Sequence, residues 1–249
     1  MGSIIEVFPG RRHVATLADV WRGAAMPDAG PARVRTARLE DFAAIRALYK
    51  AESPFAAPWT LKQLESQMHA FPEGQLVAAS DGQVVGASSM LIVGWDEYAA
   101  NHTWREITGD GNFTTHDPGG RTLYCAGFAA DESRHGYGVA RALLQAQRRL
   151  ARRMNLRRII ATARLAGLGR LAGETPEVYA MRVIWGDLED PPLRFKLAQG
   201  FQYCGILHGH RPEDVESGGH AALLAWLNPM YAPPGPTAYM ASRGQLRSA

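Results

Sequence analysis

Two glycines lie between an apolar run and a long helix-forming segment, a position where backbone amides can bind an anion. The apolar run ends near Ala130, a short polar loop follows, and Gly136 and Gly138 precede the segment 139–154. Glycine lets the backbone approach a ligand closely, and a helix N-terminus adds partial positive charge. The spacing therefore predicts a phosphate-binding turn between a strand and a helix.

The turn matches neither of two common phosphate-binding motifs. No Gly-Lys-Ser or Gly-Lys-Thr follows the glycines, which excludes a P-loop. A third glycine at Rossmann spacing is missing, and only one strand–helix unit surrounds the turn.

Positive charge is concentrated next to the same turn. The stretch from Ser133 to Gly173 contains ten arginines and no Asp or Glu, although the net charge of the chain is only +3. Such a field would attract an anion, which a phosphorylated cofactor or a nucleic acid would satisfy. A solvated helix face explains the distal arginines equally well, and nucleic acid is the least favoured partner.

Length and composition fit one globular domain with extensions. The chain has 249 residues, of which 46% are hydrophobic and 20% charged. We expect no membrane span, because no run of about 18 apolar residues occurs, and no secretory signal at the N-terminus. Cys125 and Cys204 both lie in strand-like runs, so we expect reduced, buried thiols in a cytoplasmic protein.

Hydrophobic periodicity predicts a mixed sheet with helices on both faces. Asp81-Gly82 is typical of a type I′ hairpin turn, and Gly200 of a helix C-terminal cap. The domain is expected over residues 32–228, between an extension (1–31) and a flexible tail (229–249). The expected strands are 33–38, 75–80, 83–93, 122–130, 158–164, 201–207 and 220–227, and the expected helices 41–49, 60–70, 139–154, 176–185 and 192–198.

Two motifs and this element order together resemble the GCN5-related N-acetyltransferases (GNAT family) over residues 33–228. The motifs are Arg134-His-Gly-Tyr-Gly-Val-Ala-Arg-Ala-Leu-Leu and Phe195-Lys-Leu-Ala-Gln-Gly-Phe. The loop sequences His102-Thr-Trp-Arg-Glu-Ile-Thr-Gly-Asp-Gly and Thr114-Thr-His-Asp-Pro look like the acetyltransferase domain fused to carbon–nitrogen hydrolases in bacterial proteins, of which this chain resembles a stand-alone version. The resemblance implies an α/β fold: a GNAT-like mixed, mostly antiparallel seven-stranded sheet flanked by helices on both faces.

The resemblance also implies acetyl-CoA as co-substrate, with no metal. The glycine turn would bind its pyrophosphate, with Gly138 and Ala140 at the last two positions of the family motif and His135 in place of its Gln or Arg; Arg134 or the backbone would substitute. The strand 128–130 would pair with pantetheine, and one of its N–H groups would polarise the thioester carbonyl. The expected contact residues are Phe128, Ala129, Ala130, Arg134, His135, Gly136, Tyr137, Gly138, Val139, Ala140 and Arg141.

The family's usual acid and base are both replaced here. Lys196 stands where the family usually has its acid, a tyrosine, and Gly127 stands where it usually has its base, a glutamate. Glu106 and His116, in the long loop 94–121, are therefore candidate bases for the acceptor amine, and Tyr124 is the candidate acid for the thiolate. Each has a structural alternative: a turn cap for Glu106, an Asx turn for His116, and a core aromatic for Tyr124.

Two other chemistries are disfavoured. His208, His210 and His220 invite a metal site, but no Cys pair or His-Glu helix motif accompanies them. Cys125 lies mid-strand, which does not suit a nucleophile.

The sequence thus predicts an acetyl-CoA-dependent N-acyltransferase. The acetyl group would pass to an amine, on a small molecule or a protein, by direct attack in a ternary complex. The alternative is a non-catalytic acyl-CoA-binding module that partners a separate hydrolase. A homodimer is left open.

Overall fold

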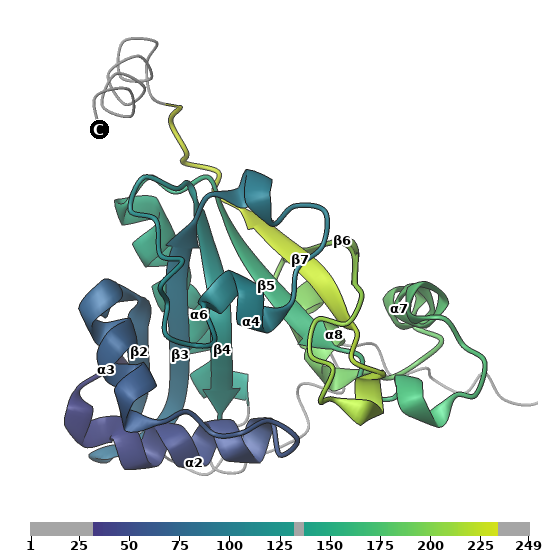
Figure 1. Cartoon of the computed structure of the whole chain (residues 1–249), viewed down its shortest axis with the longest axis horizontal. Helices are drawn as coiled ribbons and strands as arrows, with labels where there is room; N and C mark the ends of the chain where they lie inside the picture. Colours follow the sequence, from purple (N-terminus) through teal and green to yellow (C-terminus); the bar gives the residue numbers. More distant parts are fainter. Residues whose placement is uncertain (1–31, 132–136, 234–249) are drawn as a thin grey trace, which may run out of the picture.

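The computed structural model describes residues 32–131 and 137–233 and shows one seven-stranded sheet in the order β1-β2-β3-β4-β5-β7-β6 (Figure 1). The strands are β1 (Arg33–Thr36), β2 (Gln75–Ser80), β3 (Gln83–Val93), β4 (Thr122–Ala130), β5 (Arg158–Arg164), β6 (Gln202–Leu207) and β7 (Ala221–Leu227). The helices are α2 (Phe42–Glu52), α3 (Leu61–Ala70), α4 (Trp104–Thr108), α6 (Tyr137–Arg153), α7 (Pro176–Trp185) and α8 (Pro191–Ala198). Short 3-10 turns are η1 (Leu39–Asp41), η2 (Pro72–Gly74), η3 (Trp95–Glu97), η4 (Leu168–Arg170) and η5 (Val215–Ser217).

Every predicted strand and helix is present, and the predicted fold class is confirmed. At the hairpin between β2 and β3, Asp81 and Gly82 both have positive φ, 49° and 77°, as a type I′ turn requires. Gly200 has a φ of 77° just beyond α8, as expected for a left-handed cap. Thr60 and Thr103 each accept a hydrogen bond from the third residue of the helix that follows, so side-chain caps set where α3 and α4 begin.

The one parallel strand pair, β4 and β5, separates along its length. All other neighbours in the sheet are antiparallel. Pairing between β4 and β5 covers only Thr122–Tyr124 against Arg158–Ile160, although the strands continue to Ala130 and Arg164. Figure 1 shows them side by side at one end and well apart at the other. The sheet is therefore split between β4 and β5 from the residue after Tyr124 to the C-terminal end of β4.

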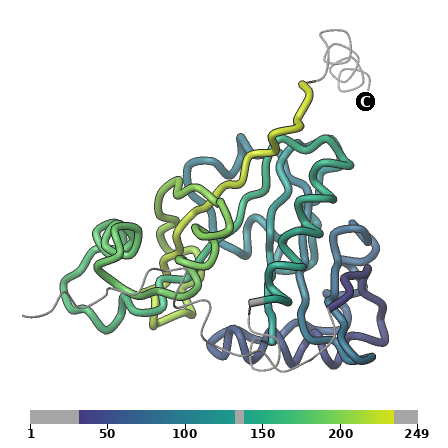
Figure 2. Tube along the Cα trace, turned by 180° about the vertical axis from the view of Figure 1, so that it is seen from behind, coloured from purple at the N-terminus to yellow at the C-terminus, as the bar shows by residue number. Residues whose placement is uncertain are grey.

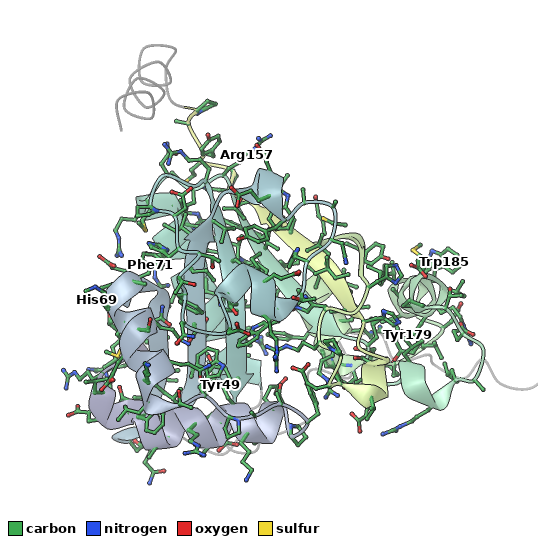
Figure 3. The ribbon with its side chains drawn as sticks, viewed as in Figure 1. Tyr49, His69, Phe71, Arg157, Tyr179 and Trp185 are labelled. Atoms are coloured by element: carbon green, nitrogen blue, oxygen red, sulfur yellow. The ribbon has the colours of Figure 1, made fainter. Side chains whose placement is uncertain are left out.

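Alternation along the strands sends side chains to two different helical layers. Met90 packs with residues of α6 and α8, whereas the adjacent Leu91 packs with Ile107 of α4. Figures 1 and 2 show α2, α3 and α4 on one face of the sheet and α6 on the other. α7 lies beside β6, where Trp185 is 68% exposed (Figure 3).

Four local expectations are corrected. The helix expected over residues 139–154 runs instead from Tyr137 to Arg153, which leaves Met154 beyond its end and 38% exposed. Cys204 was expected to be buried; it is exposed because β6 is an edge strand, whereas Cys125 is buried. The helix expected from residue 41 begins at Phe42, and the Asp41 carboxylate binds Arg35 instead of capping it. The loop 94–121 contains η3 and α4.

The ends of the predicted domain are only partly described. Residues 1–31 lie outside the described residues. In the predicted tail, Ala232 exchanges two backbone hydrogen bonds with the Asn155 side chain, at 2.7 and 2.9 Å. The boundary at residue 228 therefore stays a prediction. Among the described helices, none is long and apolar enough to cross a membrane.

Candidate active site

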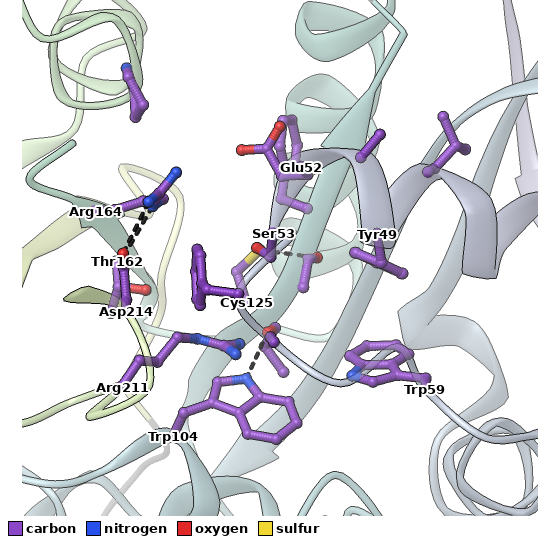
Figure 4. A pocket seen from close by; sticks show the side chains of 18 of the residues that line it. Tyr49, Glu52, Ser53, Trp59, Trp104, Cys125, Thr162, Arg164, Arg211 and Asp214 are labelled. Carbon is purple, nitrogen blue, oxygen red and sulfur yellow. Dashed lines mark hydrogen bonds and ion pairs between the residues drawn. The ribbon is translucent and has the colours of Figure 1, made fainter. Parts of the chain in front are cut away.

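A cleft of about 1120 Å³ opens at the split between β4 and β5 (Figure 4). Its walls come from β4 and β5, the end of α2, the segment 53–60, α4, α8 and the loop 210–214. Because β4 has lost its neighbour here, the side of its backbone that faces β5 is free of strand pairing over residues 125–130 of the described chain. The cleft therefore gives a ligand access to main-chain hydrogen-bonding groups in the middle of the sheet.

A β-bulge at Ala126 reshapes the exposed strand. Ser89 pairs with Gly127 but Met90 pairs with Cys125, which leaves Ala126 as the extra residue. The Ala126 carbonyl accepts a 2.7 Å hydrogen bond from Nε1 of Trp104 on α4. The indole is thus fixed beside the bulge, on the face of the sheet that carries α2.

Aromatic rings explain the glycine at position 127. A Cβ atom at Gly127 would lie 2.9 Å from ring atoms of both Tyr49 and Trp59, whose centroids are 4.5 Å apart. Tyr49 projects from α2 towards the sheet at this point (Figure 3). The rings occupy the space that a glutamate side chain at this position would need, so this packing excludes the base that the family resemblance implies.

We expect Gly127→Ala to destabilise the protein by roughly 1–3 kcal/mol, because buried rings on both sides must move. Urea unfolding measures the change. Gly82→Ala is a poor control because of its positive φ, whereas Gly138→Ala is suitable, since a Cβ there meets nothing within 4 Å. Equal stability of Gly127→Ala and the wild type would contradict this packing.

The predicted cofactor residues that the structure describes divide into three groups. Phe128, Ala130 and Ala140 line the cleft. Ala129 and Val139 are buried in the core. Gly138 and Arg141 are exposed on the first turns of α6, which Tyr137 begins. Arg134, His135 and Gly136 lie outside the described residues, so their contacts stay predictions.

Glu106 does not reach the cleft. Its carboxylate accepts hydrogen bonds from the Thr103 backbone N–H at 2.7 Å and from the Thr103 hydroxyl at 2.9 Å, closing a capping box at the start of α4. These two bonds lower the pKa of the exposed carboxyl group. A surface carboxylate that caps its own helix is poorly placed to take a proton from a bound amine.

His116 also points elsewhere. Its Nδ1 accepts a 3.1 Å hydrogen bond from the Ile92 backbone N–H, and its ring stacks on Phe71 with centroids 4.9 Å apart. Burial lowers its pKa. His116 is absent from the cleft wall and fastens the loop 94–121 to β3.

Tyr124 is fully buried beneath the cleft, and burial raises its pKa. Its hydroxyl lies 3.4 Å from Nε2 of His210, whose Nδ1 lies 3.1 Å from the carbonyl oxygen of His102. His210 therefore donates from Nδ1, and its Nε2 accepts from Tyr124. The structure places Glu106, His116 and Tyr124 apart from one another and outside the cleft.

Lys196 is the buried cation of the cleft. It lies on α8, is 8% exposed, and holds its Nζ 4.7 Å from the centroid of the Phe128 ring. It makes no ion pair with any described residue, and burial lowers its pKa below the ordinary lysine value. The sequence marked this position only as a departure from the family tyrosine.

Two arginines face the cleft from the opposite wall: Arg164, which belongs to the ten-arginine stretch, and Arg211, which the sequence did not single out. Arg164 at the end of β5 binds Asp214 at 2.8 and 2.9 Å and Glu216 at 2.8 Å. Arg211 lies over the Trp104 ring at 4.3 Å. No local pattern marks Arg211, because the loop 208–220 and β5 meet only in the folded chain.

The histidines near this wall do not form a metal site. His208 and His220 have ring centroids 5.2 Å apart, and His210 is directed to Tyr124 instead. Within the described ranges, no group of three or more His, Cys, Asp or Glu could hold a metal ion.

The distal arginines of α6 have a structural role. The guanidinium groups of Arg148 and Arg152 lie 5.3 and 5.6 Å from the Trp226 ring, and Arg148 also donates to the Gln199 carbonyl. Two of the ten arginines in the basic stretch therefore pack over an aromatic ring of the sheet.

The sheet is mostly antiparallel, it is split between β4 and β5 with a cleft at the split, and a helix follows the exposed strand β4. Together these features define an acetyltransferase-type domain. The model of the acetyltransferase (GNAT) family matches residues 42–169, and the chain belongs to this family. The recognised family is therefore confirmed, and membership supports acetyl-CoA as the co-substrate and acyl transfer as the general activity.

Relatives and structures agree with this assignment. An uncharacterised N-acetyltransferase of Bacillus subtilis, YkwB, is 30% identical over 70% of this chain and 76% of its own length. The probable hydrolase YhcX of the same organism is 33% identical over 80% of this chain, which spans only 39% of that protein. Two solved structures share the fold. The loading GNAT-like domain of CurA from Lyngbya majuscula has a TM-score of 0.68 and 17% identity, over 79% of this chain and 98% of that one. The GNAT-like decarboxylase GphF has a TM-score of 0.63 and 23% identity, over 79% of this chain and 99% of that one.

Proposed function

We propose that the protein transfers an acetyl group from acetyl-CoA to an amine by direct attack within the cleft. The observation that carries the proposal is the split between β4 and β5, which frees the backbone of β4 beside the bulge at Ala126. A thioester carbonyl bound there would meet main-chain N–H groups that stabilise its developing negative charge. The acyl group would lie in the cleft, with CoA extending along β4 towards the start of α6.

The start of α6 suits the phosphates of CoA. Gly138 is exposed, and a Cβ there would contact nothing within 4 Å, so the space beside this backbone is open. The helix that begins here is 17 residues long and has no acidic residue in its first turn. The predicted contacts of Arg134, His135 and Gly136 belong to this part of the proposal.

Lys196 is the side chain we assign to the thiolate leaving group, in place of Tyr124. It is held against Phe128 on the side of the cleft where CoA would lie. A lowered pKa brings the ammonium group closer to the range in which it can give up a proton. The same positive charge would stabilise a thiolate before the proton moves.

The acceptor amine must lose a proton before or during attack. Glu106 and His116 lie outside the cleft, whereas five acidic residues line it: Glu52, Asp110, Asp131, Glu213 and Asp214. We therefore assign deprotonation to one of these carboxylates, acting directly or through water. Release of CoA from acetyl-CoA in the presence of a panel of amines tests the proposed reaction.

The second candidate function is a non-catalytic acyl-CoA-binding module that works with a hydrolase. One observation favours it: the relative named a probable hydrolase contains a region like this chain within a protein more than twice as long. Sustained formation of an acetylated amine by the isolated chain rejects this candidate. Tight acetyl-CoA binding without any turnover supports it.

We expect Gly138→Trp to weaken acetyl-CoA binding at least tenfold without unfolding the protein. The indole would fill the open space beside the backbone at the start of α6, and no atom within 4 Å of the new Cβ opposes it. Calorimetry measures the affinity, and circular dichroism checks the fold. Unchanged affinity in a folded Gly138→Trp protein would contradict this placement of the cofactor.

A further inference from the structure

Two arginines share one wall of the cleft, and only one of them makes hydrogen bonds to carboxylates. Arg164 makes three hydrogen bonds at 2.8–2.9 Å to the carboxylates of Asp214 and Glu216. Arg211 comes no closer than 3.8 Å to a carboxylate, that of Glu213, and its guanidinium makes no hydrogen bond within the described chain. Five N–H donors are therefore available at Arg211.

The Arg211 side chain is directed into the cleft. It is 23% exposed, it lines the cavity, and Figure 4 shows it extending over the Trp104 ring towards Cys125. Burial lowers its pKa, and the nearby carboxylates of Glu213 and Asp214 oppose this shift only in part. Such a guanidinium gains most from a ligand that brings a carboxylate.

Arg211 is also held in place by its neighbours. Its backbone N–H donates to the Gly219 carbonyl at 3.0 Å, and the preceding residue, His210, accepts a 2.9 Å hydrogen bond from the Trp104 backbone N–H. The Trp104 indole beneath the guanidinium is itself bonded to Ala126 at the bulge. The cation is thus fixed relative to the strand that would bind the thioester.

An aromatic surface continues from this cation towards α2. Trp104 and Trp59 have centroids 6.3 Å apart, and Trp59 and Tyr49 are 4.5 Å apart. All three residues line the cleft. This arrangement, a cation beside aromatic rings, matches a molecule with a carboxylate next to an apolar group.

We propose that Arg211 binds the carboxylate of the acceptor, and that the acceptor is an α-amino acid with an aromatic or large apolar side chain. This inference rests on the proposed acetyl transfer. With the carboxylate on Arg211, the neighbouring α-amine attacks the thioester carbon. An N–C bond forms and the C–S bond breaks. The amine proton passes to a carboxylate or water, and Lys196 protonates the thiolate. The products are an N-acetyl amino acid and CoA.

A matched pair of acceptors isolates the carboxylate. L-phenylalanine and phenethylamine differ only in that group, and each is assayed with acetyl-CoA. We expect the wild type to prefer L-phenylalanine by roughly 30- to 100-fold in kcat/KM, the worth of a charge-assisted bidentate contact. Arg211→Met should remove this preference by lowering kcat/KM for L-phenylalanine towards that for phenethylamine, and Arg211→Lys should fall between. Arg46→Met, on the exposed face of α2, is the control and should keep the preference.

Other outcomes overturn the assignment. Equal rates with the two acceptors in the wild type, or an unchanged preference in a folded Arg211→Met protein, would exclude a carboxylate anchor at Arg211. The carboxylate could instead belong to the acyl group. Binding of malonyl-CoA that weakens in Arg211→Met, together with no preference between the acceptors, would assign the arginine to the donor and reject our proposal.

Failure of acetyl transfer itself is distinguishable. If the wild type acetylates no amine, calorimetry with L-phenylalanine and the CoA-loaded protein still tests the subsite. Binding that is lost in Arg211→Met and kept in Arg46→Met supports the carboxylate site without the transfer reaction. No binding to the wild type rejects it.

Discussion

Lys196→Met should produce a protein that still binds acetyl-CoA but transfers acetyl groups roughly 100 to 1000 times more slowly, the range typical of a lost acid catalyst. The change removes the ammonium group and keeps an unbranched side chain of similar length against Phe128. Because Lys196 is 8% exposed and makes no ion pair with a described residue, the variant should also unfold at a higher temperature than the wild type.

The pH dependence follows from the lowered pKa of Lys196. Below this lowered pKa, the folded protein carries the full cost of a buried charge. As the pH rises from there towards 10.5, the folded state is neutral while the unfolded state still binds a proton, so the free energy of unfolding increases. The stability advantage of Lys196→Met should therefore be largest at low pH and shrink as the pH rises through this window.

Two measurements check this prediction. Steady-state rates with acetyl-CoA give the loss of turnover, and urea unfolding at several pH values gives the stability difference. Arg46→Met, which also exchanges a cation for methionine but on the surface, should change neither. Full activity of Lys196→Met would show that the thiolate leaves without help from this residue.

The fold could be predicted because its signals are local. The dipeptide Asp81-Gly82 alone predicts both the turn type and the hairpin. The Thr60 side chain caps α3 and so marks where this helix begins. Periodicity and capping therefore sufficed for the fold. The cofactor contacts on β4 and α6 come from the family resemblance, and they stay predictions.

The acceptor half could not be predicted for a physical reason. Glu106 and His116 have suitable chemistry and lie in the right loop, but a capping box and a backbone hydrogen bond to Ile92 use their polar atoms. The residues that do face the cleft, Lys196 and Arg211, come from segments far from β4 in sequence. Their meeting depends on how far β5 diverges from β4, which no short pattern records.

His210 should make the protein sensitive to acid. Burial lowers its pKa to about 3, from an ordinary value of 6.5, because both ring nitrogens are enclosed between His102 and Tyr124. Below pH 6.5 the unfolded chain binds a proton that the folded chain excludes, so stability falls with decreasing pH. The loss should approach about 5 kcal/mol near pH 3, and be about 2 kcal/mol at pH 5.

His210→Asn isolates this contribution. Its amide retains a donor near the position of Nδ1 but cannot titrate, while His102 and His116, whose pKa values are also lowered, are unchanged. We expect the variant to be less stable than the wild type at pH 7, since the contact with Tyr124 is lost, and to lose about 2 kcal/mol less than the wild type between pH 7 and pH 5. Urea unfolding at the two pH values measures both terms. Identical pH dependence in the two proteins would mean that His210 is protonated in the folded state, and the contact that holds the segment before Arg211 would then have to be reassigned.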